Sequence, residues 1–188
     1  MKTFLNCLLQ KEPRIIPKKK VVFVVGHHRL AMGARAFNGI PEYEYWSEGC
    51  ERVVEGISNR DMCEVVYRDG TNIAGAIMRA AELEPDVIIE CHFNAFNGQA
   101  HGAESLVLHP TTMASEFLEG WCRHANLRSR GLKVVRSGQA GFTSVNTMKQ
   151  LGIEGFLFEA FFGDNPNDYR PMGVVGEYLT EWILKLNE

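Results

Sequence analysis

A short, continuous apolar run over residues 21–25 constrains the fold more than any other feature of the sequence. The run consists of four valines around Phe23 and ends at Gly26. Such a run, rich in β-branched residues and closed by a turn-forming glycine, is typical of a strand buried on both faces of a sheet. The sequence therefore favours a sheet with helices on both of its sides.

Further strand-like runs alternate with helical patterns along the rest of the chain. Apolar residues spaced for one face of a helix begin at Trp46, Ile73, Met113 and Val175. The strand-like runs between these helices are residues 64–67, 87–89, 105–108 and 156–158. This alternation of strands and helices predicts an α/β layer domain with a largely parallel sheet.

The size and composition of the chain are those of an ordinary globular protein. Its 188 residues fit one domain, with 45% hydrophobic and 23% charged residues. We expect an N-terminal extension over residues 1–20 and a single domain over residues 21–188. The formal net charge of -3 argues against a nucleic acid as the main partner. We expect no stable membrane insertion, because no apolar stretch is long enough to span a bilayer. We also expect a monomer without a clear signal peptide.

Polar residues at the ends of three strand-like runs are candidates for a metal site. Ligands of open α/β sheets bind beyond the carboxyl ends of the strands. Gly26-His27-His28 ends the first run, and His92 closes the third; a histidine at a strand tip is able to present a ring nitrogen to a metal. Glu159 follows the last run. A lone carboxylate there is costly to bury unless it is paired, hydrogen-bonded or close to a metal.

The start of the first helix supplies carboxylates for the same site. Glu42 and Glu44 both lie in the segment 42–46. Two histidines and one carboxylate, with a fourth position open to water, form a known catalytic zinc arrangement. Glu42 and Glu44 also have a purely structural explanation, since acidic residues at a helix start interact favourably with the helix dipole.

Five segments occur in a characteristic order. The chain resembles the zinc-dependent N-acetylmuramoyl-L-alanine amidases of the amidase-3 type, including phage endolysin catalytic domains, from about Val21 to its C-terminus. The segments that carry this resemblance are Gly26-His27, Glu42-Tyr43-Glu44-Tyr45-Trp46, His92-Phe93-Asn94-Ala95-Phe96, Gly102-Ala103-Glu104-Ser105 and Phe158-Glu159-Ala160-Phe161-Phe162-Gly163-Asp164-Asn165.

The resemblance implies both a fold and a reaction. The implied fold is a three-layer α/β domain, in which a twisted, mostly parallel mixed sheet of about six strands is flanked by helices on both faces. His27, Glu42 and His92 would hold Zn2+, and Glu159 would match the catalytic glutamate. The implied reaction is hydrolysis of the amide bond between N-acetylmuramic acid and L-alanine in peptidoglycan. The protein would then act on the cell wall, either as a phage lysin released from the host cytoplasm or within the bacterial cell envelope.

The chain departs from the family pattern at several positions. Val24-Val25 stand where Asp-Pro usually precedes the Gly-His pair, and His28 stands where a glycine usually follows it. His28 is therefore an alternative to His27, as Glu44 is to Glu42. Glu90 stands where the family often has serine; strand alternation places it on the face of His92, so we expect it to orient that ring.

Three other functions compete with the amidase hypothesis. A zinc carboxypeptidase or amide deacylase of related fold shares the metal chemistry, and only its products distinguish it. A non-catalytic wall-binding domain would keep the fold without the reaction. A cysteine hydrolase that uses Cys91 and His92 is disfavoured, because adjacent strand residues point to opposite faces of the sheet.

Overall fold

The buried run at the start of the chain forms a central strand, β1 (Val21–Val25), whose five side chains are all buried. The computed structural model of the chain describes residues 18–70 and 72–188. Strand β1 lies between two parallel neighbours, β2 (Cys63–Tyr67) and β3 (Val87–Asn94). Of the predicted N-terminal extension, residues 1–17 lie outside the described residues.

The remaining three strands complete a six-stranded sheet in the order β2-β1-β3-β6-β4-β5. Strand β6 (Glu154–Phe162) runs parallel to β3, while β4 (Ala103–Val107) runs antiparallel to β6 and parallel to β5 (Ser129–Val134). The sheet is therefore mixed and mostly parallel, as the sequence analysis predicts. The four adjacent parallel strands β2, β1, β3 and β6 bring the carboxyl ends of β1, β3 and β6 to one edge.

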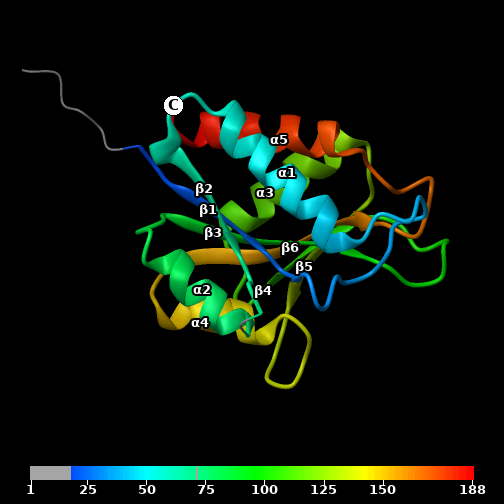
Figure 1. Cartoon of the computed structure of the whole chain (residues 1–188), viewed down its shortest axis with the longest axis horizontal. Helices are drawn as coiled ribbons and strands as arrows, with labels where there is room; N and C mark the ends of the chain where they lie inside the picture. Colours follow the sequence, from blue (N-terminus) through cyan, green and yellow to red (C-terminus); the bar gives the residue numbers. More distant parts are fainter. Residues whose placement is uncertain (1–17, 71) are drawn as a thin grey trace, which may run out of the picture.

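Helices cover both faces of the sheet, and Figure 1 shows the three layers. A 3-10 turn (Arg60–Met62) precedes β2. In the part of the chain that the structure describes, no helix is long and apolar enough to cross a membrane. One helical layer consists of α1 (Glu42–Gly56), α3 (Thr112–Ala125) and α5 (Met172–Leu186), and the other of α2 (Ile73–Ala81) and α4 (Phe142–Gln150).

Strand alternation divides the core between these two layers. Phe23, Ile89 and Phe158 belong to the cluster beneath α1, α3 and α5, whereas Val22 and Ile88 belong to the cluster beneath α2 and α4. Both sets are fully buried. Each central strand is thus apolar on both faces, which explains why its sequence shows a continuous apolar run and no alternation with polar residues.

The structure adds a strand and an α-helix that are not predicted from the sequence, and it extends two predicted strands. Strand β5 is an edge strand with exposed residues, and α4 buries only three of its nine residues, so neither carries a strong apolar pattern. The predicted ends of β3 and β6 are too early: both strands continue through polar residues, to Asn94 and Phe162. His92 and Glu159 therefore lie within paired strands rather than after them.

Candidate metal centre

The loop between β1 and α1 packs against the residues at its two ends, His27 and Glu42. The backbone of Ala34 exchanges hydrogen bonds with Glu42, accepting from its N–H at 2.9 Å and donating to its Oε2 at 3.2 Å. Gly33 has a φ of +76°, and a Cβ atom added to it would lie 2.6 Å from both Glu42 Oε2 and His27 Cδ2. Only a residue without a side chain fits there, so the loop packs closely against the pair His27 and Glu42.

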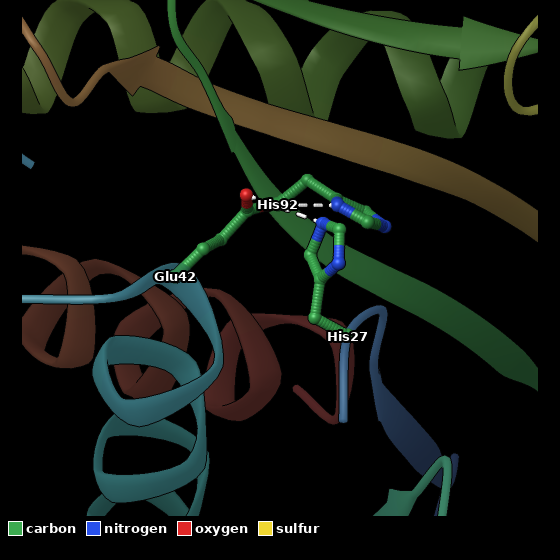
Figure 2. A group of neighbouring side chains, drawn as sticks. All are labelled: His27, Glu42 and His92. Atoms are coloured by element: carbon green, nitrogen blue, oxygen red, sulfur yellow. Dashed lines mark hydrogen bonds and ion pairs between the residues drawn. The ribbon is translucent and has the colours of Figure 1, made fainter. Parts of the chain in front are cut away.

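Three side chains from three elements converge at this edge of the sheet, as Figure 2 shows. His27 follows β1, Glu42 opens α1 and His92 lies in β3. His27 Nε2 lies 3.2 Å from Glu42 Oε2, and His92 Nδ1 lies 2.8 Å from Glu42 Oε1. One donor atom from each of the three residues falls within 4.8 Å of the other two. Their arrangement is compatible with a single ion bound between them.

Glu42 is almost entirely buried, with 2% of its surface exposed. Its Oε1 also accepts a hydrogen bond from the N–H of Phe93 at 3.1 Å. Burial by itself raises the pKa of this carboxyl, but hydrogen bonds with His27 and His92, together with the charges of those rings, outweigh it and lower the pKa to about 2. Glu42 is therefore ionised at neutral pH and available as an anionic ligand.

His92 is held from both sides by carboxylates. Its Nδ1 faces Glu42, and its Nε2 lies 2.8 Å from Oε1 of Glu90, another buried residue. Burial lowers the pKa of His92, yet the hydrogen bonds with Glu42 and Glu90 and the charges of Glu90 and Glu159 raise it well above its ordinary value. The ring is thereby fixed in orientation, with Nδ1 toward Glu42 and His27.

Glu159 lies directly beside His92, as its register partner on the neighbouring strand β6. Its Oε2 atom is buried and has no hydrogen-bond partner among the described residues. Burial raises the pKa of Glu159 to about 7; the charge of His92 opposes this rise, while Glu42, Glu104 and Glu90 add to it. A carboxyl with such a pKa exchanges protons readily near neutral pH.

A hydrogen-bonded group of polar residues that are not among the predicted site residues lies next to Glu159; it consists of Asn94, Glu104 and Arg130. Glu104 is the antiparallel register partner of Glu159 and accepts hydrogen bonds from Asn94 Nδ2 at 3.1 Å and Arg130 Nε at 2.8 Å. The Arg130 guanidinium also lies 5.0 Å from the ring centre of Phe162. The Gly-x-Glu and His-x-Asn segments point to Glu104 and Asn94, but Arg130 lies in β5, which the sequence analysis does not predict.

The alternative residues lie apart from this group. His28 turns into the loop, where its Nδ1 accepts a hydrogen bond from the N–H of Leu30 at 3.3 Å. Glu44 is exposed on α1. Cys91 is buried on the opposite face of β3 from His92, with its thiol toward the carbonyl of Ile89, and burial raises its pKa well above the ordinary value. A cysteine nucleophile activated by His92 is therefore wrong for this chain.

The fold is shared with solved amidase structures. The catalytic domain of the CD27L endolysin, which targets Clostridia difficile, is 22% identical with a TM-score of 0.69, over 90% of this chain and 99% of that one. The catalytic domain of CwlV, an N-acetylmuramoyl-L-alanine amidase from Bacillus (Paenibacillus) polymyxa var. colistinus, is 17% identical with a TM-score of 0.63, over 89% and 99%. An N-acetylmuramoyl-L-alanine amidase from Clostridium difficile is 16% identical with a TM-score of 0.68, over 90% and 97%.

Comparison of the sequence with family models identifies the reaction class. No curated protein sequence matches the chain. The family model described as N-acetylmuramoyl-L-alanine amidase, however, matches residues 21–173, a range that contains every residue of the centre described above. The chain belongs to the N-acetylmuramoyl-L-alanine amidase family, whose enzymes hydrolyse an amide bond of peptidoglycan.

Proposed function

We propose that this chain is a zinc enzyme that cleaves the amide bond between N-acetylmuramic acid and the first L-alanine of the stem peptide. In this proposal His27, Glu42 and His92 hold the ion, and Glu159 transfers the proton. The observation that carries the proposal is the convergence of three donor atoms within 4.8 Å, beside a carboxylate oxygen that has no partner among the described residues.

The set of donor atoms favours zinc over the common alternatives. Two imidazole nitrogens and one carboxylate, with a position left open, form a known ligand set of catalytic zinc. Calcium and magnesium prefer ligand sets made of oxygen atoms alone. Glu42 also offsets one of the two positive charges of a divalent ion in a place where little water reaches.

The chain's own residues supply the proton transfers of the reaction. A zinc ion, when bound, supplies Lewis acidity toward the amide carbonyl and lowers the pKa of a water molecule toward about 7. Glu159 accepts a proton from the attacking water while the oxygen of that water bonds to the carbonyl carbon. As the carbon–nitrogen bond breaks, Glu159 returns that proton to the departing L-alanine nitrogen. In the metal-free chain the pKa of Glu159 is about 7, which places its proton exchange near neutral pH.

The place of action follows from the substrate. An enzyme of this family acts on the cell wall. We infer that the chain reaches peptidoglycan either as a lysin released from a host cytoplasm or as a component of the bacterial cell envelope.

Removal of the metal is expected to abolish hydrolysis. Protein treated with a chelator and then freed from it should release no soluble fragments from purified peptidoglycan, and one equivalent of zinc should restore the rate. The measurement is turbidity loss of a cell-wall suspension, with metal content determined by mass spectrometry on the same samples. An undiminished rate in protein that contains no metal would contradict the zinc proposal.

A further inference from the structure

We propose that Glu90 is a positioning residue of the metal centre, which orients His92 and strengthens zinc binding. This proposal rests on the proposed function, since it assumes that His92 is a metal ligand. Glu90 lies two positions before His92 on β3, and its Oε1 lies 2.8 Å from His92 Nε2. A histidine ring that carries its proton on Nε2 donates a hydrogen bond to this carboxyl oxygen.

The proton on Nε2 determines which ring nitrogen is left for the ion. An imidazole binds a metal through a nitrogen that carries no proton. With Nε2–H donated to Glu90, Nδ1 is the nitrogen that gives up its proton when an ion binds, and this is the atom that faces Glu42 at 2.8 Å. Glu90 and Glu42 therefore lie on opposite edges of the same ring, one as its hydrogen-bond acceptor and the other as a fellow ligand.

One edge of the His92 ring packs closely against Gly26. A Cβ atom added to Gly26 would lie 1.8 Å from His92 Nε2 and 2.1 Å from Cε1. The Nε2 edge of the ring thus lies directly against the backbone at the end of β1. His92 reaches this position only because residue 26 has no side chain, and the carboxylate of Glu90 lies where the confined Nε2–H needs an acceptor.

The second oxygen of Glu90 indicates that the residue is not held for the stability of the fold. Glu90 is 3% exposed, and its Oε2 is buried without a hydrogen-bond partner among the described residues. Burying such an oxygen costs free energy that an apolar side chain would not lose. The carboxyl group of Glu90 instead pairs with the His92 ring through Oε1. Carboxylates that accept a hydrogen bond from a metal-bound histidine raise the basicity of the ligand and fix its orientation.

The test is the zinc affinity of Glu90 variants, measured by competition with a chromophoric chelator. We expect Glu90→Gln and Glu90→Ala to weaken zinc binding by about 10- to 100-fold, the usual effect of losing an outer partner. Glu154→Gln is the matched control: it removes a carboxylate at the far end of β6, where it accepts a hydrogen bond from Thr111 Oγ1 at 2.6 Å, and we expect wild-type zinc affinity. Thermal unfolding of the metal-free proteins should show that the Glu90 variants are folded.

A second measurement needs no variant. In two-bond proton–nitrogen NMR spectra of the zinc-loaded wild type, we expect His92 to be protonated at Nε2 and metal-bound at Nδ1. Wild-type zinc affinity in both Glu90 variants, or zinc on Nε2 of His92, would overturn the role of Glu90 while leaving the zinc proposal intact. Failure of the wild type to bind zinc would overturn the proposed function itself.

Discussion

Replacing Glu159 with glutamine is expected to slow peptidoglycan hydrolysis by about 10²- to 10⁴-fold, the range that a positioned general acid–base residue contributes. Glutamine has nearly the same size and shape, so the packing of β6 against β3 should persist. It has no carboxylate to accept a proton from water. The expected loss is therefore in kcat, with zinc content unchanged.

The position of Glu159 makes this loss a specific one. The residue lies beside His92 in the register of β3 and β6, yet its Oε2 has no partner among the described residues. Burial holds its pKa at about 7, which shows that the charged form is disfavoured in the folded protein. A neutral glutamine should thus leave the free energy of unfolding equal or higher at neutral pH.

A carboxylate elsewhere on the same strand provides the control. Glu154 lies at the other end of β6, where it accepts a hydrogen bond from Thr111 Oγ1 at 2.6 Å. Glu154→Gln is expected to keep the wild-type rate. Both variants are compared by initial rates on purified peptidoglycan after their zinc content has been matched. A Glu159→Gln enzyme with bound zinc and full kcat would show that another group moves the proton.

Replacing His27 with alanine is expected to weaken zinc binding by more than about 100-fold, because even the loss of an outer partner costs 10- to 100-fold. His27 contributes one of the three converging donor atoms, with its Nε2 3.2 Å from Glu42 Oε2. Its loss leaves two protein ligands, too few for a catalytic zinc site. Hydrolysis should fall to background at zinc concentrations that saturate the wild type.

The adjacent histidine gives this experiment a close control. His28→Ala removes the same side chain one residue further along, where Nδ1 accepts a hydrogen bond from the backbone N–H of Leu30 in the loop. We expect this variant to bind zinc as the wild type does. The measurement is the dissociation constant for zinc of each protein. If His28→Ala lost the metal while His27→Ala kept it, the choice between the two histidines would have to be reversed.

Much of this site is predictable because parallel strands deliver their carboxyl ends to one edge of a sheet. His27, His92 and Glu159 each close or extend an apolar run, so the α/β fold places them at one edge of the sheet, and the strand order β1-β3-β6 makes them neighbours. The choice between Glu42 and Glu44 does not follow. It depends on the backbone pairing between Ala34 and Glu42, which draws Glu42 inward, and on the turn of α1, which leaves Glu44 exposed.

The position of Arg130 beside the site could not be predicted from the sequence. It lies on β5, an edge strand whose exposed residues carry no apolar run. Its place beside Glu104 depends on the pairing of β4 with β5 and on a register shift in that pair. Neither the strand pairing nor its register shift leaves a pattern of apolar residues in the local sequence, because an edge strand is stabilised by pairing and not by burial of both faces.

The central claim is tested most directly by mass spectrometry of the fragments that the protein releases from purified peptidoglycan, with zinc and with chelator. We predict free stem peptides that begin with L-alanine, together with glycan strands that carry an intact lactyl group, and we predict them only when zinc is present. Shortened peptides still attached to the sugar would contradict the account and assign the centre to a peptidase.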